Sequence, residues 1–397
     1  MLDHLARNYG RIPRALWSVL LTQLVMNASH FMGVPLLAVY MVSRLRLGPL
    51  ELGTVMAANL LSAQLLPLFT GPLADRYGFK ILMVSGLVCR AIGLLGFAAW
   101  NNWIGLTAMA ALMGIGVALY ESGVYAVFGR QSKDIVRQVF VVNNQMLNAG
   151  VVIGPLIAGF LATIDIRLAF VGSGVLFLCL AIWSLALPRI EALPDTGTRV
   201  GTSLLRVLRD KRFGLFLLVC LPWFFLFSQL YVAFPVYLAK IAGDRSVPRI
   251  FMVNGITGLV FMLASMSIID KLPPRKVLPR AYLAAAIFFS SASLSSTGVW
   301  FLLFVVCYTM VETLILPAIE TLTADLAHDG SQSTFFGALS AGSALAGACG
   351  YYVGSWMVLK MDPMITWVFF GSVGLVGFIL SLYFVSRERK LGVIVTS

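Results

Sequence analysis

Long apolar segments recur along nearly the whole chain, and no other feature constrains the fold as strongly. A helix needs about 20 mostly apolar residues to cross the hydrocarbon core of a bilayer. Twelve segments of this kind can be counted, at residues 15–42, 50–74, 80–99, 103–128, 138–163, 167–187, 213–241, 247–269, 277–297, 299–326, 333–358 and 363–385. They are apolar all round, whereas strands of a membrane barrel alternate apolar and polar residues. The sequence therefore predicts an all-α membrane protein with twelve transmembrane helices.

The distribution of basic residues predicts how these helices are oriented. With both termini in the cytoplasm, 21 of the 29 Lys and Arg residues fall on the cytoplasmic side, seven on the other side and Arg90 alone within a helix. This pattern follows the positive-inside rule, so the net charge of +12 requires no nucleic-acid partner. Apolar residues make up 59% of the chain and charged residues 12%, which argues against a water-soluble domain.

The five cysteines indicate neither a disulfide framework nor a metal site. All of them lie within predicted helices, and none has the spacing of metal ligands. We therefore expect no metal and no cofactor. No cleavable signal is expected either, because the first apolar segment is long enough to span the membrane and follows a basic stretch.

The longest polar interruption divides the predicted helices into two groups of six. We expect an N-terminal six-helix bundle over residues 1–187, a cytoplasmic linker over 188–212, and a C-terminal six-helix bundle with a short cytoplasmic tail over 213–397. The linker's second part, residues 203–212, could form a short basic helix on the membrane surface.

The two groups of helices resemble each other in sequence. A shift of roughly 200 residues pairs Gln23 with Gln229, Pro35 with Pro235, Asp75 with Asp270, and Gly154 with Gly350. Two six-helix halves in one orientation are what a transporter needs if a midplane site is to open alternately to each side.

A short charged loop joins the second and third predicted helices. It reads GPLADRYGFK, from Gly71 to Lys80. Gly78 can supply the positive φ that so tight a loop needs. Asp75 can accept hydrogen bonds from Arg76, from Lys80 or from the amino end of a neighbouring helix. Such a cluster can lock one conformation at the cytoplasmic face; the alternative is a plain topological anchor of positive charge.

The pattern G-x-L-A-D-R-x-G-x-K strongly resembles the signature loop of the major facilitator superfamily. Twelve helices, two halves and a long central loop fit that family over the whole chain. The resemblance implies the major facilitator fold, with two six-helix pseudo-repeat bundles, and a secondary active transporter. The second-half counterpart of the loop, IIDKLPPRK, has prolines where glycine is expected but keeps Asp270, Lys271, Arg275 and Lys276.

A second motif, GVVIGPLIAG, lies in the fifth predicted helix. Gly150 and Gly154 share one helix face and permit close packing, and Pro155 perturbs the helix just beyond them. Ordinary packing of small residues explains the same pattern. With Gly159 included, the spacing also resembles the antiporter signature of the drug:proton exporters in this superfamily, although two of its usual glycines are absent.

Many such exporters carry an arginine in the fourth helix, and this chain has none there. The segment AALMGIGVALYESGVYAVF contains Glu121 as its only charge. The segments DKRF, DIRLAFVGSGVLF and ETLTADLA resemble the MdtH-like branch of the drug exporters. The usual proton site of the family therefore cannot be carried over, and candidates must come from this sequence.

Five ionisable side chains at membrane depth are the candidates for proton coupling: His30, Arg90, Glu121, Glu312 and Glu320. A charge placed there costs roughly 2.5–3.5 kcal/mol, so each one is a functional hypothesis. Glu312 is the deeper carboxyl and ranks first, then Glu320 and Glu121, with His30 and Arg90 as modulators. The alternative for Glu320 and Glu121 is pairing with loop arginines, and for His30 a purely structural hydrogen bond.

Amide and aromatic side chains mark a candidate substrate cavity. Gln23, Asn27 and His30 form one polar stripe on the first helix, which should face a partner helix or a water-filled cavity. The other candidates are Asn59, Asn144, Asn148, Gln229, Tyr231 and Asn254. The seventh helix contains PWFFLFSQLY, whose aromatic residues either face lipid or form an adaptable wall for lipophilic substrates.

These features favour a secondary active transporter that exports a small amphipathic molecule, such as a drug, in exchange for protons across the bacterial inner membrane. The sequence lacks the phosphate-binding loop of an ATP-driven pump, and no residue arrangement suggests an enzyme. The alternatives are a dedicated exporter of a siderophore, metallophore or sugar, then a proton symporter or a non-transporting receptor or scaffold. The expected partners are the substrate, protons and membrane lipids, and we expect a monomer.

Overall fold

A computed structural model describes residues 12–67, 78–129, 133–186, 210–269, 273–294, 297–327 and 332–390. Contacts divide the chain into two compact units. The first unit comprises residues 1–47, 54–197 and 247–252, and the second comprises residues 48–53, 198–246 and 253–397.

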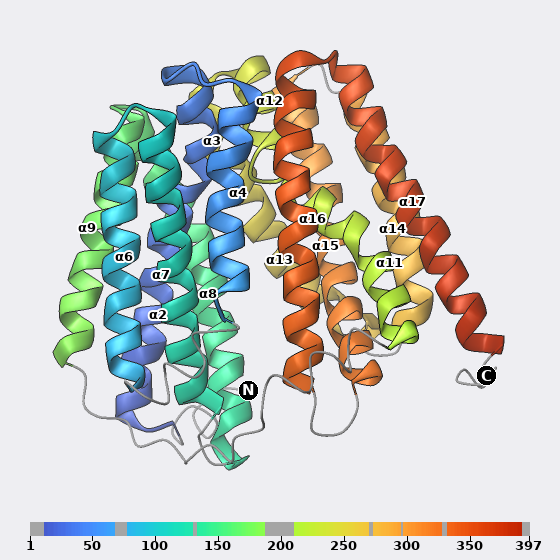
Figure 1. Cartoon of the computed structure of the whole chain (residues 1–397), viewed down its shortest axis with the longest axis horizontal. Helices are drawn as coiled ribbons and strands as arrows, with labels where there is room; N and C mark the ends of the chain where they lie inside the picture. The colour runs from blue at the N-terminus through green and yellow to red at the C-terminus, as the bar shows by residue number, and fades with distance from the viewer. Residues whose placement is uncertain are drawn as a thin grey trace. The chain divides into compact units, whose positions relative to one another are not determined.

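The helices of the first unit run alongside one another and are drawn from blue to green in Figure 1. They are α2 (Arg14–Gly33), η1 (Val34–Leu36), α3 (Leu37–Val39), η2 (Tyr40–Arg44), α4 (Pro49–Leu65), α6 (Phe79–Ala99), α7 (Trp103–Gly129), α8 (Lys133–Ala162) and α9 (Ile166–Ala186). The first few residues of α4 belong to the second unit. Helix α2 packs on α8 and α9, and α6 packs on α7 and α9.

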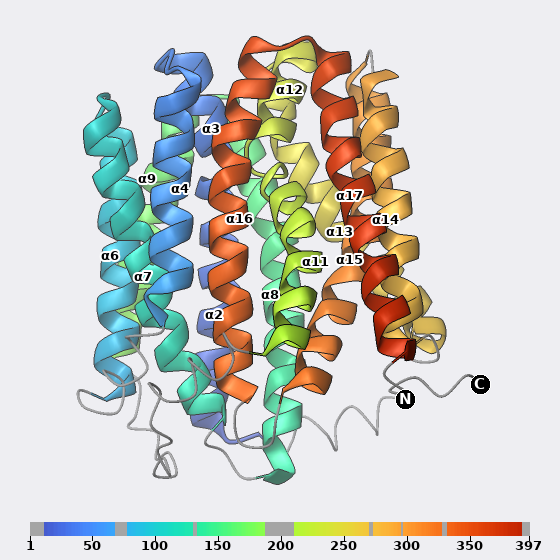
Figure 2. The same ribbon diagram turned by 45° about the vertical axis from the view of Figure 1, so that its right-hand side comes forward.

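The helices of the second unit are drawn from yellow-green to red, and Figure 2 shows them from another side. They are α11 (Lys211–Ser228), α12 (Ala233–Ala242), η3 (Asp244–Ser246), α13 (Pro248–Ile269), α14 (Pro274–Ser291), η4 (Ala292–Leu294), α15 (Gly298–Leu326), α16 (Gln332–Lys360) and α17 (Pro363–Lys390). The first residues of α13, up to Met252, belong to the first unit. Helix α11 packs on α16 and α17, and α14 packs on α15 and α17. The pairing of the first unit therefore recurs, because in both units the first long helix contacts the fifth and sixth and the third contacts the fourth and sixth.

The prediction of an all-α membrane protein is confirmed. In the described ranges the regular structure is helical and contains no strand. Nine helical segments of the described residues are long and apolar enough to cross a membrane, and α4, α13 and α16 complete the predicted set of twelve. Helix α11 begins at Lys211, two residues before the expected start, because the Asp210 carboxylate accepts hydrogen bonds from the free N–H groups of Arg212 and Phe213.

The first membrane segment of each unit is interrupted at a proline. Helix α2 ends at Gly33, and the chain continues through the tight turn η1, which contains Pro35, and the wide turn η2. Helix α11 ends at Ser228, and α12 begins at Ala233 with Pro235 in its first turn. A proline removes one backbone donor and clashes with the preceding turn, so both interruptions follow from the sequence.

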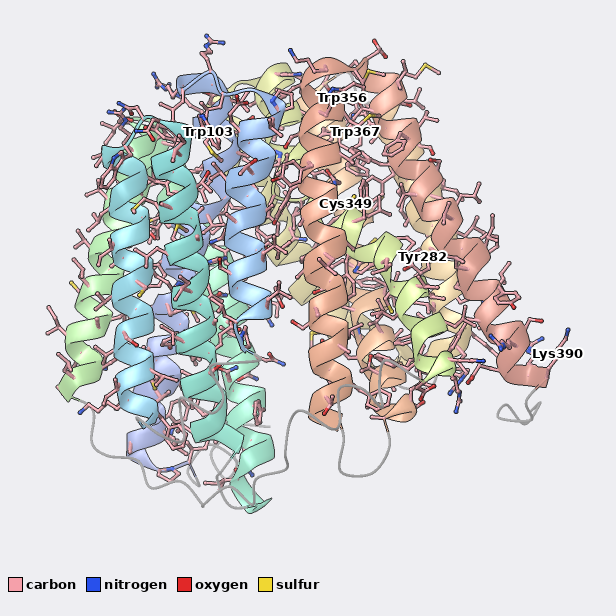
Figure 3. All side chains as sticks on the ribbon, viewed as in Figure 1. Trp103, Tyr282, Cys349, Trp356, Trp367 and Lys390 are labelled. Carbon is pink, nitrogen blue, oxygen red and sulfur yellow. The ribbon has the colours of Figure 1, made fainter. Side chains whose placement is uncertain are left out.

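Aromatic side chains fill much of the core of the second unit. Phe234, Phe289, Phe304 and Trp367 form mutual edge-on or tilted ring contacts, and Trp367 is fully buried. Figure 3 shows Trp367 near the same end of the unit as Trp356, which is half exposed, and Lys390 at the opposite end. Tryptophan at the end of an apolar helix is typical of the membrane interface.

Candidate functional site

Five of the predicted site residues line one cavity in the first unit. The cavity has a volume of about 140 Å³, and its polar lining consists of Gln23, Asn27, His30, Arg90 and Glu121. The polar stripe of α2 contributes three of them, while α6 and α7 contribute the two charges. The apolar part of the lining is formed by Met26, Phe31, Val117 and Leu147.

Arg90 is the buried centre of this site and is only 4% exposed. Its Nη2 lies 2.6 Å from Nδ1 of His30, and its Nη1 lies 3.3 Å from the sulfur of Met26. The guanidinium carbon stands 4.5 Å from the ring centroid of Phe177 on α9. Because a guanidinium only donates hydrogen bonds, Nδ1 of His30 must accept. His30 is therefore neutral in this arrangement and carries its proton on Nε2.

Glu121 supplies the opposite charge. It projects from α7 into the same cavity, and its carboxylate attracts the Arg90 guanidinium. The two groups nevertheless do not form an ion pair, and neither of them has an ion-pair partner among the described residues. The cavity thus holds one positive and one negative group that attract each other without a direct ion pair.

Helix α8 closes this site against α2 through amide groups. Nε2 of Gln23 donates to Oδ1 of Asn143 at 2.8 Å, and Nδ2 of Asn27 donates to the carbonyl oxygen of Leu147 at 2.5 Å. Asn143 is 2% exposed, whereas the predicted Asn144 is exposed and Asn148 is partly exposed. Sequence reasoning named Asn144 and not Asn143, because only the packing of α8 on α2 shows which of the two meets Gln23.

The glycines of the antiporter-like motif bring α8 close to α2. A Cβ at Gly150 would lie 2.7 Å from Cβ of Asn27, and one at Gly154 would lie 2.5 Å from the carbonyl oxygen of Ala28. At Gly159 the nearest atom would be 3.6 Å away, which is an ordinary contact. Pro155 lies inside α8, which continues past it. In the structure, Gly150 and Gly154 of this motif therefore form a close-packing surface against α2.

In the second unit, Asn254 and Glu312 form a hydrogen-bonded pair. Nδ2 of Asn254 on α13 lies 2.7 Å from Oε2 of Glu312 on α15, and 3.0 Å from Oγ1 of Thr309. Tyr231 lies near enough to Glu312 for an electrostatic interaction between the two side chains. Glu320 is exposed further along α15 and does not join this group. Thr309 was not predicted, but it lies one helical turn before Glu312 on the same face.

Two amide candidates take part in helix packing. Gln229 is fully buried, and its Nε2 donates to the carbonyl oxygen of Phe225 at 2.9 Å and to that of Gly350 at 3.0 Å. The structure therefore places Gln229 between α11 and α16, not on the cavity wall where it was expected. Asn59 likewise donates to the carbonyl oxygen of Ala110 at 3.0 Å and links α4 to α7.

The signature loop is described only at its end. Gly71, Asp75 and Arg76 lie outside the described residues. Gly78 has φ of +85° immediately before α6, as its place in the loop predicts, and Lys80 lies in the first turn of that helix.

The second-half counterpart of this loop starts its helix in a different way. Pro274 is the first residue of α14 and follows Pro273, whose φ is −63°. Proline fits this position because its fixed φ suits a helix start and its missing N–H would have no partner there. This explains why the degenerate motif needs no glycine. Asp270 and Lys271 lie outside the described residues.

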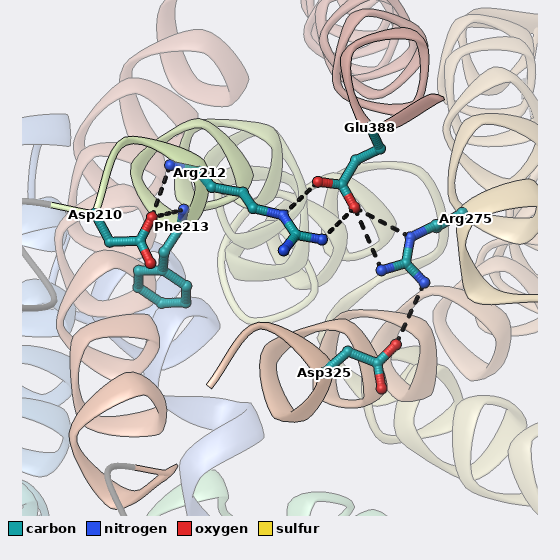
Figure 4. A network of polar contacts seen from close by, with 6 residues as sticks. All are labelled: Asp210, Arg212, Phe213, Arg275, Asp325 and Glu388. Carbon is teal, nitrogen blue, oxygen red and sulfur yellow. Dashed lines mark hydrogen bonds and ion pairs between the residues drawn. The ribbon is translucent and has the colours of Figure 1, made fainter. Parts of the chain in front are cut away.

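Arg275 of this counterpart belongs to a charged network (Figure 4). Glu388 at the end of α17 accepts hydrogen bonds from Nε and Nη2 of Arg212 at 2.5 and 2.7 Å, and its Oε2 lies 3.3 Å from Nη2 of Arg275. Nη1 of Arg275 lies 3.4 Å from Asp325 on α15. The network joins α11, α14, α15 and α17, and the Glu388 side chain is only 2% exposed. Sequence reasoning named Arg275 but not Glu388. Glu388 stands among basic residues at the end of the last helix, where an exposed side chain is expected.

The fold and the two groups of buried polar residues define a multi-pass membrane transporter built from repeated helices. The sequence pattern of the Major Facilitator Superfamily matches residues 19–348 and, in an overlapping match, residues 250–395. The chain therefore belongs to this superfamily.

Known proteins agree with this assignment. The multidrug resistance protein MdtH of Yersinia enterocolitica is 27% identical, with 97% of this chain and 96% of that protein covered. The MdtH of Proteus mirabilis is 28% identical over 96% of this chain and 95% of its own length. A crystal structure of the nucleoside transporter NupG superposes with a TM-score of 0.80 at 13% identity, covering 94% of this chain and 99% of NupG, which shows the shared fold.

Proposed function

We propose that this transporter exports a small amphipathic molecule across the bacterial inner membrane in exchange for protons. The observation that carries the proposal is the hydrogen-bonded pair of Asn254 and Glu312 in the middle of α15. An ionisable carboxyl at this depth of an apolar helix is costly unless it serves a function. The MdtH relatives, named for multidrug resistance, support export of amphipathic compounds.

In this proposal one unit binds the proton and the other binds the substrate. Glu312 in the second unit takes up and releases the proton, and the cavity around Arg90 in the first unit receives the polar part of the substrate. A proton on Glu312 removes its charge and favours one access state, while bound substrate favours the other. Exchange follows because each ligand stabilises the state that releases the other.

The orientation and the gate are part of the same proposal. The positive-inside rule supports a cytoplasmic location of both termini. The bundles over residues 1–187 and 213–397 rock against each other, and the loop from Gly71 to Lys80 locks one access state through Asp75.

The test is proton flux in liposomes that contain the purified full chain, with a pH gradient imposed across the membrane. Lipophilic cations, zwitterions, metallophores and sugars are added one class at a time. Proton release on addition of one amphipathic class supports exchange and identifies the class. Uptake of substrate together with protons, or proton release with none of the classes, contradicts the proposal.

A further inference from the structure

We propose that the first-unit cavity binds the head group of a zwitterionic substrate, with its anionic group on Arg90 and its cationic group on Glu121. The proposal rests on the transport function proposed above. It adds the chemical class of the substrate and the side chain that recognises each charge.

Arg90 is held in position, and no carboxylate of a described residue lies within ion-pair distance of it. Its described contacts are the neutral imidazole of His30, the sulfur of Met26 and the ring face of Phe177. These contacts fix the direction of the guanidinium, and none of them carries a negative charge. A buried cation gains most from a carboxylate, sulfonate or phosphate that accepts two of its N–H groups together. The cavity leaves that position to a ligand.

Glu121 prevents the cavity from being a simple anion site. Glu121 lines the same cavity as Arg90, and neither side chain forms an ion pair with a described residue. A ligand with only an anionic group would bring a second negative charge next to Glu121. A ligand with only a cationic group would bring a second positive charge next to Arg90. A zwitterion satisfies both side chains and leaves the net charge of the buried site unchanged, which avoids the cost of burying an unpaired charge.

Gln23 provides a further polar group for such a head. Its side chain is 2% exposed, its Nε2 is used by Asn143, and its Oε1 has no hydrogen-bond donor among the described residues. Buried polar atoms are almost always paired, so an unpaired acceptor at the wall of a cavity indicates a missing donor. An ammonium N–H of the ligand has the required chemistry.

The size of the cavity limits what it can take. A volume of about 140 Å³ corresponds to about five water molecules. This is enough for an ammonium and a carboxylate joined by one carbon, as in an amino acid, but not for a whole drug-sized molecule. The apolar body of the substrate therefore lies outside the cavity, which fits an amphipathic compound.

The experiment uses three probes that share one aromatic body: tryptophan, tryptamine, which lacks the carboxylate, and indole-3-propionate, which lacks the ammonium. Equilibrium binding of each probe to the full chain in lipid nanodiscs is measured by calorimetry at neutral pH. We expect tryptophan to bind about tenfold more tightly than either single-charge probe, since the loss of one partner of a buried charge pair weakens binding at least that much.

Two substitutions should each remove one part of this preference for tryptophan. Arg90→Gln should remove the advantage of tryptophan over tryptamine, because the repelling cation is gone. Glu121→Gln should remove its advantage over indole-3-propionate. Lys360→Gln, an exposed charge at the end of α16 in the second unit, is the control and should leave all three affinities unchanged. Equal binding of the three probes to the unsubstituted protein overturns the proposal, even if Arg90→Gln fails to fold. An equal loss of all three probes in a folded Arg90→Gln protein also overturns it.

Binding is measured without a proton gradient, so the two proposals fail separately. Charge-selective binding of tryptophan without proton release by any compound overturns the exchange function alone. Proton release by other amphipathic compounds, with no binding of the three probes, overturns the zwitterion site alone.

Discussion

The two units pack their helices in the same pattern but bury charge in different ways. In the first unit, Arg90 and Glu121 line one cavity without forming an ion pair. In the second unit, Glu312 is hydrogen-bonded to the amide of Asn254. A repeated scaffold therefore sets where the helices lie, while a few side chains decide what each unit can bind. In our proposals the first arrangement binds a ligand with two charges and the second binds a proton.

The contact between the first and fifth helices differs between the units in a similar way. In the first unit, Gly154 faces the backbone of α2 at Ala28. In the second unit, Gly354 faces the side chain of Gln229, which fills the space between α11 and α16. Gly350 of the second unit also meets backbone, at the carbonyl oxygen of Phe225. The difference therefore lies between Gly154, which meets backbone, and Gly354, which meets a side chain.

The largest effect is expected from Glu312→Gln. The amide keeps the size of the side chain and an oxygen for Asn254 but cannot carry a proton. Proton release on addition of substrate should fall to the level of protein-free liposomes, measured with a pH-sensitive dye. Substrate binding to the first-unit cavity should remain.

Glu320→Gln is the matched control on the same helix, because Glu320 is exposed and has no part in the Asn254 pair. It should keep its proton release. If Glu312→Gln exchanges protons normally and Glu320→Gln does not, the second unit still carries the proton but through the other carboxyl. If both retain exchange, the division of work between the units is wrong.

The next prediction compares the stability lost when Gly154 and Gly354 are each replaced by alanine. Gly154→Ala would place a Cβ 2.5 Å from a backbone oxygen, and backbone cannot move aside without separating α2 from α8. We expect a loss of about 3 kcal/mol in stability, the upper part of the usual range for overpacking. Gly354→Ala meets only a side-chain amide, so a loss of about 1 kcal/mol is expected. Unfolding of the purified proteins in mild detergent measures both.

Gly159→Ala serves as the control, since the added methyl group would make only an ordinary contact at 3.6 Å. Its stability should match that of the unsubstituted protein. Equal losses at Gly154 and Gly354 would show that the two contacts are equally rigid and would remove this difference between the units.

Sequence reasoning predicted the helices well because a membrane imposes length and apolarity on each segment. It also found the polar stripe of α2, since helical periodicity shows which side chains share a face. Periodicity does not show what a face meets. The choice between Asn143 and Asn144, the packing of Gln229 on α16 and the contact of Arg90 with His30 all depend on neighbours more than 50 residues away. Glu388 was missed for the same reason, because both of its arginine partners come from other helices.

The last comparison lies within the charged network of the second unit. Glu388→Gln leaves Arg212 and Arg275 without the carboxylate between them. Loss of one partner of a fully buried pair costs about 3–5 kcal/mol, but the side chain of Arg212 is 36% exposed and can regain water. We therefore expect a loss of about 2 kcal/mol. In Asp325→Asn the changed side chain is 45% exposed, so the loss should stay below about 1 kcal/mol. The same detergent unfolding assay measures both, and a loss from Asp325→Asn as large as that from Glu388→Gln would mean that exposure does not govern the strength of this network.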